Sequence, residues 1–322
     1  MVEKLIIDNF AGIEHLEIEV KKINIMIGPQ ASGKSVCAKL LFYFKEFVSE
    51  LIKAVENDRT KRQLDSSYSN KFKEYFPPKF WGNYNFVLRY EINHDFIQIS
   101  RNHSKSTILI NYSDSYQSAF SVLRKIYRQR QKEILESLSY DPSTVAFDIR
   151  SEMMNYFEKT LGKESTFIQF FIPAVRSFFA HIQKSIFSIL SSQSFLDPFL
   201  EKFGSLYEFM KNIFEINEFD LERQRFTNEN IKPLVEKILC GQYVYEKGED
   251  FLEISDGRKI SISTCSSGQQ ETLPLVVILS TVPFLQTIGT GQTIYIEEPE
   301  AHVFPTAQKH IVELIATVFN SK

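Results

Sequence analysis

The fold of this 322-residue chain is decided by one stretch, Gly28-Pro29-Gln30-Ala31-Ser32-Gly33-Lys34-Ser35. Its spacing, G-x-x-x-x-G-K-[ST], is that of a phosphate-binding (Walker A) loop. An apolar run, Ile23-Asn24-Ile25-Met26-Ile27, precedes the loop and predicts a buried strand. Residues 36–42 follow it and predict the start of an amphipathic helix. Strand, loop and helix in that order are the context that the motif requires. The alternative is a glycine turn that matches the motif by chance, and such a turn would not need these flanking segments.

The residue types of this stretch suit a nucleotide. Gly28 and Gly33 free the backbone so that successive N–H groups can surround phosphate oxygens. The start of the following helix adds a partial positive charge. Lys34 is expected to reach the β- and γ-phosphates, and the Ser35 hydroxyl to ligate Mg²⁺. The sequence therefore predicts ATP and Mg²⁺ as ligands, bound by Gly28, Pro29, Gln30, Ala31, Ser32, Gly33, Lys34 and Ser35.

Composition and length limit the class of protein to which this chain can belong. A hydrophobic fraction of 43% is enough for a core, and the length allows two domains or one domain with a large insertion. A net charge of −3 gives no overall attraction to nucleic acid. The three cysteines lack metal-site spacing, which indicates free thiols in a reducing compartment. Asp8 and Asn9 interrupt any signal-peptide core, and no apolar run approaches the ~18 residues of a membrane span, so we expect a cytoplasmic protein.

A second motif lies near the C-terminus, in Thr293-Ile294-Tyr295-Ile296-Glu297-Glu298-Pro299. Four strand-forming residues that end in two carboxylates are typical of a Walker B strand. Glu297 is expected to hold the metal, directly or through water. Glu298 is expected to orient or deprotonate the attacking water, which makes it the predicted catalytic base. Alone this pattern is weak, but it complements the phosphate loop.

A third motif, Cys265-Ser266-Ser267-Gly268-Gln269-Gln270, opens an apolar segment that predicts a buried helix. A Ser-Ser-Gly turn at a helix start presents a hydroxyl and free N–H groups, which can bind an anion. The alternative is a simple helix N-cap. The candidate nucleotide contacts here are Ser266, Ser267, Gly268 and Gln269.

The three motifs, in this order, resemble the ABC-type ATPases. Cys265 stands at the leucine of the family's Leu-Ser-Gly-Gly-Gln signature, Ser267 at its first glycine, and Glu297-Glu298-Pro299 at its Asp-Glu-Pro. The resemblance implies an α/β ATPase head, a mixed β-sheet flanked by helices, with a mostly helical insertion. It also implies a head-to-tail homodimer, in which Ser266 and Gly268 contact the γ-phosphate bound by the partner's phosphate loop.

Four segments are similar to a bacterial subgroup, the OLD-like and Septu-type ATPases, which are similar to RecF and SMC ATPases. They are 5–10, 171–176, 266–271 and 297–302. This similarity implies a sensor or regulatory subunit in antiphage defence that controls a nuclease or toxin subunit. The alternatives are a DNA repair or recombination ATPase that acts on DNA ends, and a non-hydrolysing ATP-dependent scaffold. A partner subunit is expected to do any cutting, since no nuclease cluster is present.

The predicted organisation has three parts: lobe I with the phosphate loop at 1–113, a mostly helical insertion at 114–235 with a core strand near 166–172, and lobe II at 236–322. Residues 58–83 predict loops and a short helix. Residues 116–137 predict a basic helix, which is either a solvated face or a contact for a DNA or RNA backbone. Its basic residues are Arg124, Lys125, Arg128, Arg130 and Lys132.

Some positions leave alternatives open. Gln169 is a candidate Q-loop glutamine or a strand residue, and Pro173–Arg176 lies near the nucleotide or ends a strand. His302 matches the family's dimer-contacting D-loop. The family's switch histidine has no counterpart: after His302 comes only His310, in a predicted helix. Either the chain is a fragment or the switch is absent, so hydrolysis is predicted from fewer motifs than ATP binding.

Overall fold

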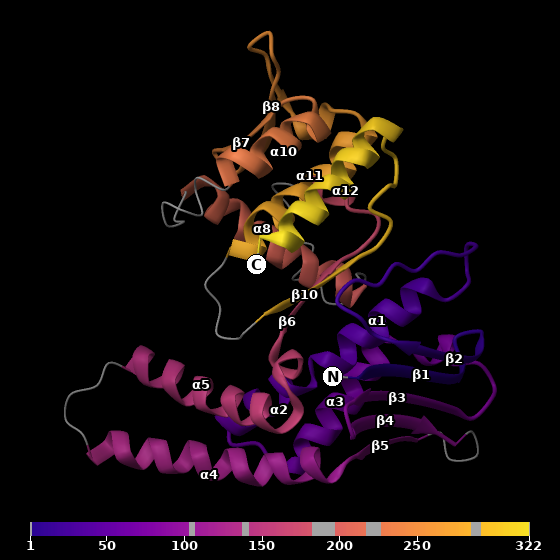
Figure 1. Ribbon diagram of the computed structural model, residues 1–322, viewed down its shortest axis with the longest axis vertical. Coiled ribbons are helices and arrows are strands. Elements are labelled where there is room, and N and C mark those ends of the chain that lie inside the picture. The colour runs from indigo at the N-terminus through magenta and orange to yellow at the C-terminus, as the bar shows by residue number, and fades with distance from the viewer. Residues whose placement is uncertain are drawn as a thin grey trace. The chain divides into compact units, whose positions relative to one another are not determined.

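The computed structural model describes residues 2–102, 107–136, 142–181, 197–216, 227–284 and 291–321. The chain is mixed α/β, with a multistranded sheet flanked by helices, as the sequence predicts (Figure 1). It divides into two compact units, one of residues 1–170 with 287–293 and one of residues 171–286 with 294–322. Each unit is described by itself. The three-part division above remains a prediction.

The first unit contains an antiparallel sheet of order β2-β1-β3-β4-β5. Its strands are β1 (Glu3–Phe10), β2 (Ile13–Glu19), β3 (Phe86–Ile92), β4 (Asp95–Arg101) and β5 (Ile108–Tyr112). Leu5 faces Ile18 on one side and Tyr90 on the other, which sets the register of the three strands. Ala11 and Gly12 take positive φ angles of 52° and 85°, the backbone that the tight β1–β2 turn requires. The pairs β1–β2 and β3–β4 are both antiparallel hairpins.

The helices of this unit bury an aromatic core. They are α1 (Lys34–Lys45), α2 (Phe47–Glu56), α3 (Lys61–Tyr75), η1 (Pro78–Phe80), α4 (Asp114–Glu136), α5 (Pro142–Leu161) and η3 (Lys163–Thr166). Tyr43 of α1 stacks on Tyr68 of α3 at 4.5 Å between ring centroids, and each hydroxyl donates to the other residue's carbonyl oxygen. Residues 58–83 contain more helix than the predicted loops and short helix: besides η1, α3 has 15 residues, and Thr60 and Gln63 form a capping box at its start.

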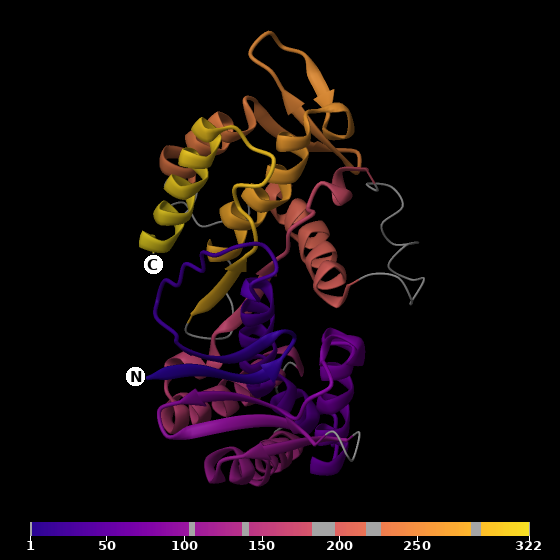
Figure 2. The same cartoon turned by 90° about the vertical axis from the view of Figure 1, so that its right-hand side faces the viewer.

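The second unit is built around α11 (Ser267–Thr281), which contacts α8, α10 and α12 (Figure 1, Figure 2). Residues 270–281 of α11 are all buried. Its other elements are α6 (Phe178–His181), α8 (Pro198–Ile216), η4 (Thr227–Ile231), α10 (Lys232–Leu239), β7 (Gln242–Glu246), β8 (Glu249–Glu253), β9 (Lys259–Ser261), η5 (Ile262–Thr264), η6 (Val282–Phe284) and α12 (Pro305–Asn320). The strands β7, β8 and β9 form an antiparallel meander.

A buried polar cluster joins α8 to this meander. Asp250 of β8 is fully buried, and its carboxylate accepts hydrogen bonds from the hydroxyls of Tyr243 and Tyr207 at 2.7 and 3.2 Å. The Lys211 ammonium, also buried, lies 3.4 Å from the same carboxylate. Because each of these polar groups has a partner, the meander can pack against α8 without leaving a buried charge unpaired.

Two strands, β6 (Ile168–Ile172) and β10 (Gln292–Ile296), pair with each other. The amide of Ile168 donates to Gly291 O at 3.1 Å, and the amide of Glu297 donates to Ile172 O at 2.9 Å. Residue numbers rise in the same direction in both strands, so the pair is parallel. The strand that the sequence predicts before Glu297 and Glu298 is therefore confirmed.

The buried strand predicted at Ile23–Ile27 was wrong. In the described part of the chain no strand pairs with it, and Ile23, Ile25 and Ile27 are 59%, 79% and 91% exposed. Alternating apolar residues form a strand only where a neighbour accepts their backbone hydrogen bonds. After β2, the Asn24 side chain accepts from the Lys21 amide at 2.9 Å and donates to the Lys21 carbonyl at 2.7 Å, which closes a local turn in place of strand pairing.

Candidate functional site

The phosphate loop leads directly into α1. Gly33 caps that helix with a φ of 88°, and Ala31 before it also has a positive φ, 62°. A Cβ added to Gly33 would lie 2.6 Å from Ile13 Cδ1, and one added to Gly28 would lie 3.1 Å from Ser32 Oγ. The loop therefore leaves almost no room for side chains at its two glycines. Such a curled backbone at a helix start presents N–H groups to an anion.

Lys34 lies over the loop. Its ammonium donates to Gly28 O at 2.8 Å, to Pro29 O at 2.7 Å and to Ser32 Oγ at 3.5 Å. Ser35, the next residue of α1, is exposed. The ammonium, the hydroxyl and the helix start thus belong to one short segment, a set of donors that fits a phosphate chain and its Mg²⁺.

The third motif, Cys265–Gln270, is called the signature turn below, and it caps α11 in the second unit. The Ser266 hydroxyl accepts from Gln269 N at 3.3 Å, while Gln269 Oε1 accepts from Ser266 N at 3.1 Å. This capping box is the local structure that the N-cap interpretation predicts. It also leaves Ser266 and Ser267 exposed at the helix start. A Cβ on Gly268 would lie 2.7 Å from His302 O, so this glycine permits the close approach of the segment after β10.

The end of β10 carries the two predicted acids. Glu297 Oε2 accepts from the amide of Ala174 at 3.3 Å. Glu297 Oε1 is buried and has no hydrogen-bond partner among the described residues. A buried oxygen in that state fits a metal ion or a metal-bound water, which would satisfy it. Glu298 is exposed and has a φ of 42°, a backbone that few residues other than glycine adopt.

In the described part of the chain, no three His, Cys, Asp or Glu side chains gather into a cluster able to hold a metal by themselves. Mg²⁺ usually binds through one or two carboxylates and substrate phosphates, and keeps several waters. Glu297 and the Ser35 hydroxyl are the kinds of ligand that such a site uses. They lie in different units, so the structure leaves their prediction as metal ligands untested.

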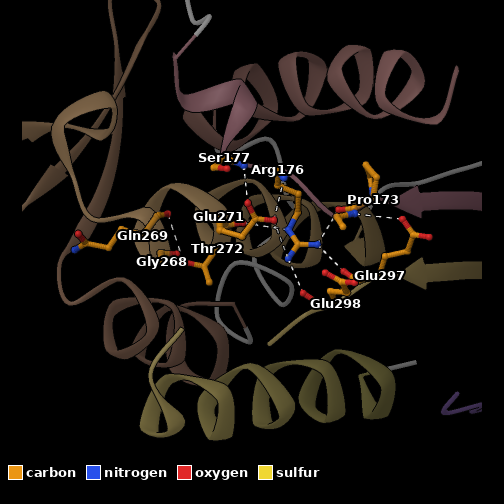
Figure 3. A network of polar contacts seen from close by, with 10 residues as sticks. Pro173, Arg176, Ser177, Gly268, Gln269, Glu271, Thr272, Glu297 and Glu298 are labelled. Atoms are coloured by element: carbon orange, nitrogen blue, oxygen red, sulfur yellow. Dashed lines mark hydrogen bonds and ion pairs between the residues drawn. The ribbon is translucent and has the colours of Figure 1, made fainter. Parts of the chain in front are cut away.

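A buried ion pair that sequence reasoning left out of the site lies beside these acids (Figure 3). Arg176 is fully buried, Glu271 of α11 is 1% exposed, and Arg176 Nη2 lies 3.3 Å from Glu271 Oε1. Burial lowers the pKa of Arg176, while the charge of Glu271 opposes that shift. The signal in the sequence was a glutamate directly before the apolar run of a helix predicted to be buried, because a buried charge needs a partner.

The same guanidinium also binds the backbone of Glu297 and Glu298, the segment after β10 that is called the Walker B end below. Arg176 Nη1 donates to Pro173 O and to Glu297 O, both at 2.7 Å, and Nη2 donates to Glu298 O at 3.0 Å (Figure 3). Arg176 Nε donates to Glu271 O at 3.1 Å. The structure thus brings the signature helix, the Pro173–Arg176 segment and the Walker B end together within one unit.

The structure also gives the contacts of Gln169 and of the basic residues on α4. Gln169 lies in β6, and its side-chain amide donates to Phe167 O, as expected of a strand residue. On α4, Arg124 and Arg128 pair with Asp58 at 2.5 and 3.9 Å. Arg130 pairs with Glu133 at 2.8 Å and with Glu152 at 2.6 Å. These pairs suit a solvated helix face, since they already balance much of the positive charge.

Comparison with known protein families identifies the family of this chain. The AAA ATPase domain family matches the chain over residues 1–322. No curated protein sequence matches it significantly. Among the helices of the described residues, none combines the length and the apolar character needed to cross a membrane. The shared domain of the matching family is a P-loop ATPase domain, which implies ATP as ligand, usually with Mg²⁺, and ATP hydrolysis as activity. The phosphate loop, the mixed α/β fold and the full-length match lead to one conclusion: this chain belongs to the AAA ATPase domain family.

Proposed function

We propose that this protein binds MgATP at Gly28–Ser35 and hydrolyses it in an ABC-type arrangement. The observation that carries the proposal is the Lys34 ammonium, held over a glycine loop at the start of α1. That loop offers a cation, backbone N–H groups and a helix dipole to the phosphates. No other segment in the described residues combines a Gly-x-x-x-x-Gly-Lys-Ser sequence with a helix start.

The roles of the remaining residues follow from their chemistry. Lys34 would exchange its bonds to loop carbonyls for stronger charge-assisted bonds to phosphate oxygens. Ser35 and Glu297 would hold the metal, which supplies charge stabilisation for the transferred phosphoryl group. Glu298, exposed at the end of β10, would take a proton from the attacking water.

Two variants test this assignment. Lys34→Ala should remove tight ATP binding, because neutral alanine leaves the β- and γ-phosphates without their main side-chain counterion. Glu298→Gln should keep ATP binding and stop turnover, because glutamine still hydrogen-bonds water but takes no proton. Calorimetry and phosphate release measure the two effects. Wild-type affinity in the first variant would refute the phosphate-loop assignment, and wild-type turnover in the second would refute Glu298 as the base.

The dimer is the finer part of the proposal. The exposed Ser266 and Ser267 at the start of α11 would contact the γ-phosphate held by the partner subunit. Ser266→Arg should leave ATP binding to the monomer intact while ATP-driven dimerisation and hydrolysis fail. Mixed with Lys34→Ala, it should regain some activity, since the heterodimer contains one intact composite site. Full activity of Ser266→Arg alone would refute the role of the signature turn.

In the cell, we propose a nucleotide-gated sensor subunit of a bacterial antiphage defence system that controls a nuclease or toxin subunit. The support is the similarity of four motif segments to OLD-like and Septu-type ATPases. A gene for a small nuclease beside this one would agree with the proposal. Strong stimulation of the ATPase by DNA ends alone would favour a repair or recombination ATPase, and stable ATP occupancy without turnover would favour a scaffold.

A further inference from the structure

Among the described residues, the Arg176 guanidinium bonds to groups in three segments of the second unit. It reaches Glu271 of α11, the carbonyl of Pro173, and the carbonyls of Glu297 and Glu298. Its side chain has no exposed surface, so it cannot touch a nucleotide directly. Any effect of Arg176 on the reaction must therefore pass through the groups that it holds.

The loop before Arg176 makes the same connection with its backbone. The amide of Ala174 donates to the carboxylate of Glu297 at 3.3 Å. The amides of Arg176 and Ser177 donate to the two carboxylate oxygens of Glu271 at 2.9 and 2.8 Å. One short loop thus binds an acid of the signature helix and an acid of the Walker B end (Figure 3).

This loop carries backbone strain. Val175 has a φ of 65°, a conformation that costs a β-branched residue on the order of 1–3 kcal/mol. Such a conformation persists only where the surrounding contacts over-determine it. The bonds to Glu271 and Glu297 on both sides of Val175 provide that constraint.

The position of Glu298 depends on these contacts. Glu298 also has a positive φ, 42°, and its carbonyl accepts from Arg176 and from the amide of Ala301 at 3.1 Å. Because the planar guanidinium of Arg176 donates to the carbonyls of both Glu297 and Glu298, it sets the orientation of the peptide group that joins these two residues. The direction of the Glu298 side chain follows from that peptide.

We propose that Arg176 and Glu271 form a positioning tie that aligns Glu298 with the signature turn. Glu271 lies one helical turn after Ser267 and Gly268, so a shift of the start of α11 moves the carboxylate that holds Arg176. Gly268 against His302 O makes a second contact between the same two segments. The tie couples docking at the signature turn to the alignment of the base. This inference rests on the ATPase activity proposed above.

A structural role alone would not require this arrangement. A well-packed apolar pair of similar volume often stabilises a core as well as a buried ion pair does. An apolar pair, however, cannot fix the orientation of two consecutive carbonyls. The geometry therefore points to alignment, which changes the rate of the chemical step rather than the affinity for ATP.

The test is Arg176→Lys, which keeps the charge but loses the fork. We expect kcat to fall about 100-fold, the scale of a misplacement of about 1 Å, while the Kd for ATP changes less than about twofold. In a Glu298→Gln background, the same substitution should leave the residual single-turnover rate unchanged, because its effect passes through Glu298. Glu271→Gln, which keeps the side-chain shape, should also lower kcat without changing Kd.

Lys211→Met is the matched control, because it breaks another buried ion pair of the same unit, with Asp250. It should lower the unfolding temperature and leave kcat per folded molecule unchanged. If folded Arg176→Lys and Glu271→Gln both keep wild-type kcat while Lys34→Ala loses ATP, the tie is refuted and the ATPase proposal stands. Losses that only follow the folded fraction, as in Lys211→Met, would also refute the tie. If the wild-type protein turns over no ATP, the proposed function fails first.

Discussion

Replacement of Gly33 by alanine tests the conformation of the phosphate loop. Gly33 has a φ of 88°, and a Cβ there would lie 2.6 Å from Ile13 Cδ1 and 2.9 Å from Ile13 Cγ1. The substitution therefore adds two separate costs: a strained backbone, and a contact that the Ile13 side chain must turn to relieve.

The two costs can be estimated. An L-residue in the left-handed region loses roughly 1–2 kcal/mol relative to glycine. Turning Ile13 away from its preferred rotamer costs roughly 0.5–1.5 kcal/mol. If ATP binds the loop in this conformation, the sum of about 1.5–3.5 kcal/mol weakens binding by about 10- to 300-fold, at 1.4 kcal/mol per factor of ten.

Titration calorimetry with ATP provides the assay, with two companion variants. Gly82→Ala is the matched control, because Gly82 has a φ of 74° in the same unit and no atom within 4 Å of an added Cβ. It should lower stability and leave the Kd for ATP unchanged. Ile13→Ala combined with Gly33→Ala removes both contacting atoms and should recover about 2- to 12-fold of the lost affinity.

Two results would refute the reasoning. If Gly33→Ala binds ATP within twofold of wild type, the nucleotide does not bind the loop in the conformation seen here. If affinity falls but Ile13→Ala restores none of it, the loss comes from the backbone alone and the contact with Ile13 plays no part.

Three further substitutions or reactions test other parts of the structure. Gly268→Ala should lower the free energy of unfolding by roughly 1–3 kcal/mol in urea titrations, because the new Cβ would lie 2.7 Å from the backbone oxygen of His302, which cannot rotate away; an unchanged midpoint would contradict that contact. Val175→Gly should raise stability by about 1 kcal/mol, because it relieves the positive φ of an exposed side chain, and a loss would show that the strain is absent. Iodoacetamide at pH 8 should modify exposed Cys240 well before Cys37, because burial raises the pKa of Cys37 to about 11; mass spectrometry that found equal rates would contradict its burial.

Local interactions explain what could be predicted from the sequence. The loop at Gly28–Ser35 and the capping box of Ser266 and Gln269 each depend on residues within a few positions of one another. The strand before Glu297 was recognisable because four strand-forming residues precede two acids. Where a short segment contains its own physical constraint, its pattern predicts its structure.

Only the tertiary structure decided the rest. Ile23–Ile27 has the alternation of a strand, yet a strand also needs a partner for its backbone hydrogen bonds, and alternation within one segment cannot supply that partner. Arg176 and Glu271 stand 95 positions apart, and neither belongs to a recognised spacing. A buried charge is stable only when the fold brings its partner within hydrogen-bonding distance, so the pair becomes visible only once the chain is folded. By itself the sequence predicted the phosphate loop and the two downstream motifs, while tertiary packing decided which residues contact Glu297 and Glu298.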